Sequence, residues 1–165
     1  SLPELVVVSS CSKNFGLYGE RVGAMALICD SDESAKVATT VVAAAARAMY
    51  SMPPDHGAAI VQLILNDADL RKEWDAELTE MRNRINGLRA QLVTQIQSAG
   101  IDSDFSFIER EKGMFSFLGV NVDQVQSLVN DYSIYLVNSS RINVAGVNDG
   151  NIAYLADSLA TVLKA

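Results

Sequence analysis

An apolar stripe between Asp67 and Gly100 constrains the fold of this chain more than any other feature of its sequence. Its members recur in steps of three or four, which places them on one face of a helix; they are Leu70, Trp74, Leu78, Met81, Ile85, Leu88, Leu92 and Ile96. Acidic residues gather in the first half of this segment and arginines in the second, which suits the helix dipole. The spacing predicts one long helix through to Gly100, and we interpret Trp74 as part of its buried face.

The residues before this helix predict a second helical region. Asp30 and Glu33 have the spacing of a capping box, in which two side chains satisfy free N–H groups at a helix start. Apolar residues then recur at helical spacing, which predicts a helix over about 31–50 that stops at the proline pair beginning with Pro53. A short buried helix is expected over 58–65.

The elements after Gly100 are shorter. Residues 105–108 and 114–117 alternate apolar and polar side chains around a charged turn, which predicts two antiparallel strands. The remaining elements that we expect are a helix capped by Asn121 and Gln124 and ending near Asp131, short strands over 134–137 and 142–145, and a final helix over about 149–164. Together they predict one compact α/β unit from residue 67 onward.

Charge and cysteine content narrow the class of protein. The formal net charge is -7 at pH 7 and no block of Lys and Arg is present, which argues against a nucleic-acid partner. The two cysteines, Cys11 and Cys29, do not make a disulfide framework, so we expect free thiols and a cytoplasmic protein. No apolar run approaches the about 18 residues of a membrane span and no signal-peptide pattern is present, so we expect neither membrane insertion nor secretion.

One segment near the N-terminus indicates a chemistry. The run Ser10–Gly23 reads SCSKNFGLYGERVG and connects two apolar, β-branched stretches, residues 5–9 and 22–29, which predict buried strands. Lys13 lies in this connection, with serines on both sides and Arg21 beyond it. An amine can hold an aldehyde as a Schiff base, while hydroxyls and a guanidinium suit a phosphate. The segment therefore has the groups needed to hold a phosphorylated aldehyde.

This run resembles the active-site lysine segment of class I pyridoxal-phosphate aminotransferases, most closely the aspartate and aromatic amino-acid branch, and fills every fixed position of its pattern. The resemblance implies pyridoxal 5'-phosphate as the cofactor, with Lys13 as its covalent anchor and as the catalytic general base. It implies that Ser10 and Arg21 bind the cofactor phosphate, with Ser12 as a further candidate. The single His56 has no cluster of metal ligands around it, so we expect no metal site.

Two later segments also match this family. Arg141 lies in the run NSSRINVAG, which resembles the family stretch whose arginine grips the α-carboxylate of the substrate. The alternative for Arg141 is a structural ion pair at a strand edge. Phe115 lies in GMFSF, which matches a family strand that forms an apolar wall beside the substrate. A core phenylalanine explains Phe115 as well.

Arg47 marks a third matching segment, RAMYSMPP, which resembles the family pattern R-x-x-Y-S-N-P-P except that Met52 replaces Asn. In that family the arginine reaches the neighbouring subunit and pairs with the distal carboxylate of a dicarboxylic substrate. The resemblance therefore implies a homodimer in the full-length enzyme. The alternative is an arginine that is favoured at a helix C-terminus by the dipole.

The resemblance also implies a domain organisation. Residues 1–66 would be the C-terminal end of the large cofactor-binding domain, and residues 67–165 the α/β small domain of a fold-type I aminotransferase. The family's phosphate loop, its aspartate on the pyridine nitrogen and its ring-stacking aromatic have no counterpart among these residues. We therefore expect the chain alone, whether a piece of an enzyme or one polypeptide of an assembly, to hold an incomplete active site.

The leading interpretation is transfer of an amino group from an aromatic or dicarboxylic amino acid to a 2-oxo acid. A lyase or decarboxylase of the same fold would share Lys13 and Arg141 but seldom the stretch around Arg47. A non-catalytic domain used in folding or assembly is the third alternative, and it is favoured by the missing family elements.

Overall fold

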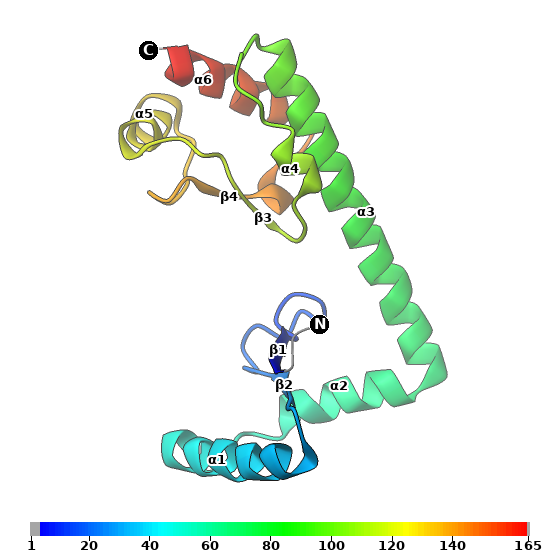
Figure 1. Ribbon diagram of the computed structural model, residues 1–165. Helices are drawn as coiled ribbons and strands as arrows, with labels where there is room; N and C mark the ends of the chain where they lie inside the picture. The colour runs from blue at the N-terminus through cyan, green and yellow to red at the C-terminus, as the bar shows by residue number, and fades with distance from the viewer. Residues whose placement is uncertain (1–3, 165) are drawn as a thin grey trace. The chain divides into compact units, whose positions relative to one another are not determined.

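The computed structural model describes residues 4–164, which fall into two compact units that divide between Leu78 and Thr79. Figure 1 labels the helices and strands of both units. Among residues 4–164, no helix combines the length and the apolar character that a membrane crossing requires.

Two antiparallel strands form the start of the first unit. Strand β1 (Leu5–Ser10) pairs with β2 (Gly23–Ile28) in a register that sets Leu5 opposite Ile28 and Ser10 opposite Gly23. This confirms the two predicted strands, and Lys13 lies in their connection. The prediction that they are buried is wrong, because the described residues supply only a two-stranded ribbon. Val6 is 58% exposed and Val8 73%.

Two helices follow the ribbon, α1 (Asp32–Tyr50) and α2 (His56–Asn66). The predicted cap of α1 is wrong by one residue: Ser31, whose backbone is extended, is the N-cap, and its hydroxyl accepts the N–H of Ser34. Helix α2 is present, but it is not the buried helix that the sequence predicts. Gly57 is the one buried residue of this helix.

The predicted long helix is confirmed as α3 (Ala68–Ser98). Its N-terminus is capped by the Asp67 carboxylate, which accepts the N–H groups of Asp69 and Leu70 at 3.0 Å. Burial is uneven along the predicted stripe. Leu70 is 37% exposed, whereas Leu92 is fully buried. The stripe is therefore a core element only where the second unit packs against it.

The second unit builds its core between α3 and six further helical or strand segments. Its further elements are α4 (Phe107–Arg110), β3 (Phe115–Phe117), α5 (Val122–Tyr132), β4 (Arg141–Asn143), the 3₁₀ turn η1 (Val144–Gly146) and α6 (Ile152–Lys164). The centre of the core is fully buried and apolar, with Leu92, Ile108, Val125, Leu128 and Leu159 as members. The predicted capping box of α5 is confirmed: Asn121 accepts from Gln124 N, and the Gln124 side chain accepts from Asn121 N.

Three predicted strands differ from the structure. Residues 105–108 do not form a strand, because Phe107 begins helix α4, and the predicted hairpin with 114–117 is therefore absent. Residues 134–137 are irregular. The strand predicted over 142–145 starts one residue earlier and ends at Asn143, where that side chain accepts Ala145 N–H and opens the η1 turn. Strand β4 pairs with β3 in an antiparallel register.

Candidate active site

The connection that carries Lys13 is a compact turn held by its own backbone. Cys11 N–H donates to the Val22 carbonyl at 3.0 Å, which continues the β1–β2 ladder into the turn. The Cys11 carbonyl in turn accepts from Leu17 N–H at 3.4 Å, and Gly16, at a φ of 67°, donates to the Lys13 carbonyl at 3.2 Å. A positive φ costs a glycine little, so Gly16 lets the chain reverse directly after the lysine.

Two of the predicted phosphate-binding residues contact one another. The Ser10 hydroxyl donates to the Ser12 hydroxyl at 3.1 Å and accepts Ser12 N–H at 3.2 Å. Ser12 is only 5% exposed, whereas Lys13 is exposed. The ammonium of Lys13 lies 5.0 Å from the ring centroid of Tyr18, a distance at which a cation is attracted to an aromatic face. The structure therefore brings Ser10, Ser12 and Lys13 into one short segment.

The Arg21 side chain binds the backbone of the same tyrosine, Tyr18. Its Nη1 donates to the Tyr18 carbonyl at 3.1 Å, and its own φ is 52°. A non-glycine residue in the left-handed region stores roughly 1 kcal/mol of backbone strain, and such strain gathers at functional sites. Lys13 and Arg21 thus both contact Tyr18 and place two cationic groups in one turn.

Trp74 anchors this turn, although the sequence indicates it only as a core residue of α3. That interpretation is wrong, because Trp74 is half-buried and its Nε1 donates to the Asn14 carbonyl at 2.7 Å. Its ring stacks on Phe15 with centroids 4.5 Å apart and an interplanar angle of 13°. A tryptophan N–H usually seeks an acceptor when it is buried, and this was the one sequence signal for such a role.

The start of α2 packs on the other end of the turn. His56 Nδ1 lies 3.0 Å from Glu20 Oε2, and a Cβ added to Gly57 would meet Glu20 Cβ at 2.8 Å and Val22 Cβ at 3.2 Å. Only a glycine fits this close approach. Within residues 4–164, no group of three His, Cys, Asp or Glu side chains is placed to hold a metal ion.

The groups on the turn fit a phosphorylated aldehyde. They comprise one amine, two hydroxyls and one guanidinium, of which the Ser12 hydroxyl is nearly buried. Asn14 Oδ1 is also buried and has no hydrogen-bond partner among the described residues. A buried polar atom without a partner is costly and is expected where a ligand or water completes a site. The set of donors is the one that phosphate oxygens prefer.

Arg47 lies apart from the turn, in the last turn of α1, and is exposed. Its carbonyl accepts Ser51 N–H at 3.1 Å, and Ser51, at a φ of 60°, ends the helix. Met52 N–H then donates to the Tyr50 carbonyl at 2.7 Å. The predicted arginine, tyrosine and serine of this segment therefore share one tight helix end.

The other predicted residues lie together in the second unit. Arg141 and Phe115 are diagonal neighbours on the paired strands β4 and β3, and the guanidinium carbon of Arg141 stands 4.7 Å from the ring centroid of Phe115. A cavity of about 370 Å³ opens beside them. Its lining consists of Phe115, Tyr135, Leu136, Val137, Arg141, Ile142 and Asn143. An exposed guanidinium on an aromatic wall is suited to bind a carboxylate with its two parallel N–H groups.

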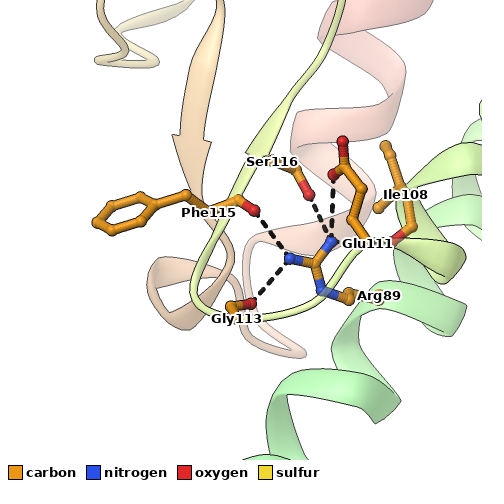
Figure 2. Close-up of polar contacts among 6 residues, drawn as sticks. All are labelled: Arg89, Ile108, Glu111, Gly113, Phe115 and Ser116. Atoms are coloured by element: carbon orange, nitrogen blue, oxygen red, sulfur yellow. Dashed lines mark hydrogen bonds and ion pairs between the residues drawn. The ribbon is translucent and has the colours of Figure 1, made fainter. Parts of the chain in front are cut away.

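The other face of β3 is held by an arginine that the sequence did not single out. Arg89 is 1% exposed. Its guanidinium binds the Gly113 carbonyl just before β3 and the Phe115 carbonyl and Ser116 hydroxyl in β3 (Figure 2). The signal for it was a charge on the buried side of α3, between Ile85 and Leu92 at helical spacing.

These observations define a mixed α/β protein with a lysine turn suited to a phosphorylated aldehyde and an arginine suited to a carboxylate. Residues 1–159 match the family described as aminotransferase class I and II, and the chain belongs to this family. Its fold is a mixed α/β portion of the aminotransferase fold.

Among its relatives, the aspartate aminotransferase of Haemophilus influenzae is 51% identical over 160 residues, which are 97% of this chain and 40% of that protein. The aromatic-amino-acid aminotransferase of Paracoccus denitrificans is 39% identical over 161 residues, which are 98% of this chain and 41% of that protein. Relatives named as mitochondrial in Gallus gallus and chloroplastic in Arabidopsis thaliana also match. The chain spans about 40% of the length of the curated relatives it matches.

A solved structure gives the same comparison in three dimensions. The aromatic-amino-acid aminotransferase from Burkholderia pseudomallei, described as covalently bound to pyridoxal phosphate, superposes with a TM-score of 0.84 at 45% identity. The match covers 96% of this chain and 40% of that one.

Proposed function

We propose that this chain provides the lysine turn and the carboxylate-binding strand of a pyridoxal 5'-phosphate-dependent aminotransferase. The reaction is transfer of an amino group from an aromatic or dicarboxylic amino acid to a 2-oxo acid. The observation that carries the proposal is the turn between β1 and β2, where Lys13, the Ser10–Ser12 hydroxyl pair and Arg21 lie within one short loop. In this proposal, residues 1–66 end the large domain, residues 67–165 form the small domain, and the enzyme works as a cytoplasmic homodimer.

Four residues of the lysine turn have proposed roles in binding the cofactor or in catalysis. Pyridoxal 5'-phosphate, when bound, supplies an electron sink for negative charge at the substrate α-carbon. Lys13 would hold the cofactor through its amine and, when that amine is free, would move a proton at the substrate α-carbon as a general base. The hydroxyls of Ser10 and Ser12 and the guanidinium of Arg21 bind the phosphate oxygens.

Three other residues bind or select the substrate in this proposal. Arg141 binds the α-carboxylate through paired N–H groups, a geometry that a lysine would not reproduce. Phe115 contacts the Arg141 guanidinium through its ring face and forms an apolar wall. Arg47, exposed at the end of α1, selects a distal carboxylate in the partner subunit's site.

A chimeric enzyme tests this function. Residues 1–165 replace the 160-residue matching portion of the Haemophilus influenzae aspartate aminotransferase. The chimera is assayed with aspartate and with tyrosine as amino donors and 2-oxoglutarate as the acceptor. We expect amino transfer, and we expect Lys13→Ala to slow it by at least about 10²-fold, the scale of one general base. A folded chimera with no amino transfer contradicts the proposal.

The same assay separates the lyase or decarboxylase alternative. Such an enzyme would release carbon dioxide or a cleaved side chain from the amino acid without producing glutamate from 2-oxoglutarate. Glutamate formed in step with loss of the donor therefore supports the aminotransferase. Release of carbon dioxide without glutamate supports the alternative.

A further inference from the structure

Arg89 binds the backbone of β3 from inside the core. Its Nη2 donates to the Gly113 carbonyl at 2.8 Å and to the Phe115 carbonyl at 2.9 Å, while its Nη1 donates to the Ser116 hydroxyl (Figure 2). Nη1 also donates to the Ile108 carbonyl of α4 at 2.8 Å. One planar guanidinium therefore ties α4, the following turn and the first half of β3 together.

The charge of Arg89 is compensated mostly by backbone dipoles. The carboxylate of Glu111 lies 3.5 Å from Nη1 and is itself 34% exposed, so it is a weak partner. Arg89 Nε has no partner among the described residues. A buried cation is costly when it replaces an apolar residue of similar size, and stability alone does not favour it. The orientation of its five donors is what an apolar side chain could not supply.

Strand β3 presents opposite faces to Arg89 and to Arg141. Ser116 points inward and is 1% exposed, whereas its neighbour Phe115 points outward and is 38% exposed. In Figure 2 the Phe115 ring extends away from the guanidinium of Arg89, although the Phe115 carbonyl binds it. The outward ring carries the Arg141 guanidinium at 4.7 Å. A shift or rotation of β3 would therefore move the Phe115 ring away from Arg141.

We propose that Arg89 is a positioning residue for Arg141, which acts by fixing the Phe115 backbone and thereby the aromatic face on which the Arg141 guanidinium rests. The inference rests on the proposed function for its consequence, namely the affinity for the substrate carboxylate. Its structural part, the dependence of the Arg141 position on Arg89, stands without that function. Arg89 touches neither substrate nor cofactor in this role.

Two variants of Arg89 and one control test the proposal. Arg89→Met removes all five donors, and Arg89→Lys retains the charge but cannot bridge two carbonyls as a planar fork does. The control, Val125→Ala, removes fully buried apolar volume from α5 and lowers stability without changing any group that hydrogen-bonds to Arg89. The first readout is the side-chain NMR resonance of Arg141 in the 165-residue chain, which the ring current of Phe115 shifts. The second is KM and kcat for 2-oxoglutarate in the chimera.

We expect both Arg89 variants to move the Arg141 resonance toward its unstacked value, whereas Val125→Ala leaves it in place. In the chimera we expect KM to rise roughly tenfold, the size of one lost charge-assisted hydrogen bond, with kcat nearly unchanged. An unmoved Arg141 resonance in a folded Arg89→Lys chain overturns the proposal. An equal shift in Val125→Ala also overturns it, because Arg89 would then act through stability alone.

Separate measurements test the proposed function and the role of Arg89. A chimera without any turnover contradicts the proposed function, and the Arg141 resonance in the chain still decides the role of Arg89. If Arg89→Met does not fold, Arg89→Lys decides by the same resonance.

Discussion

The indole Nε1 of Trp74 donates a hydrogen bond of 2.7 Å to the carbonyl of Asn14, which lies 60 residues earlier in the chain. The same ring stacks on Phe15. Because these two residues directly follow Lys13, the first turns of α3 hold the backbone on one side of the lysine. The β1–β2 ladder holds it on the other.

Substitution of Trp74 should therefore loosen the lysine turn. Trp74→Phe retains an aromatic ring but loses the N–H, and we expect the free energy of unfolding to fall by about 1 kcal/mol, the net value of one hydrogen bond. Trp74→Ala also loses the stack, and we expect about 2–3 kcal/mol in total. Urea unfolding followed by circular dichroism gives both values. An unchanged free energy of unfolding in Trp74→Ala would show that the contacts of Trp74 with Asn14 and Phe15 do not stabilise the fold.

The sequence could predict elements whose periodicity extends over several turns. Helix α3 has enough apolar positions to fix its period, and its existence was predicted correctly. Residues 105–108 offered four positions only, in which Phe105 and Ile108 lie three apart and fit one helical turn as well as a strand. Both side chains are buried in the structure, where Ile108 lies in α4 and Phe105 precedes it. Short alternating segments do not carry the information that decides between the two.

Burial was predictable only where the described residues supply a second layer. The apolar run Val6–Val8 is typical of a strand covered on both faces, but its side chains are exposed in the ribbon. In the same way, Trp74 fits the α3 stripe by spacing, yet its partners Asn14 and Phe15 are set by the tertiary fold. The positions of Lys13 and Arg141 on their elements followed from motif resemblance. The contacts of Arg89 did not, because no motif contains them.

Loss of the Arg141 guanidinium should weaken carboxylate binding. For Arg141→Gln in the chimera we expect kcat/KM for aspartate and tyrosine to fall together by roughly 10²-fold, since both donors carry an α-carboxylate and a hydrogen-bonded ion pair is lost. The matched control is Arg110→Gln, whose exposed guanidinium binds Ser106 Oγ at 2.9 Å. Steady-state kinetics with both donors give the comparison. A fall for one donor alone would contradict an α-carboxylate role.

Arg47 should act on one class of donor. In the chimera we expect Arg47→Ala to lower kcat/KM for aspartate by at least about tenfold, because one charge-assisted contact to the distal carboxylate is lost, and to leave tyrosine nearly unchanged. Arg82→Ala is the control, since Arg82 is also an exposed helix arginine and its one hydrogen bond among residues 4–164 is to Thr79 Oγ1. Competition between the two donors measures the ratio directly. An equal fall in kcat/KM for aspartate and tyrosine would show that Arg47 does not distinguish the two donors.

Acid stability should depend on Asp104. A hydrogen bond from the Ser106 side chain, and then one from Ser106 N–H at 2.8 Å, hold the pKa of Asp104 below its ordinary value. The folded state thus favours the ionised form. This contribution is present above the unfolded-state pKa and is lost as the pH falls through the folded-state pKa. We expect Asp104→Asn to lose this acid-side pH dependence, measured by urea midpoints from neutral to acid pH. An identical pH profile in both chains would contradict the assignment.

Covalent capture of the cofactor shows whether Lys13 is its anchor. The chain is incubated with pyridoxal 5'-phosphate, reduced with borohydride and digested, and the labelled peptide is identified by mass spectrometry. The controls are Lys13→Ala and Lys36→Ala, which remove the turn lysine and an exposed lysine of α1. We predict label on Lys13 that persists in Lys36→Ala and disappears in Lys13→Ala. Label spread evenly over the exposed lysines, or none on Lys13, would contradict the account.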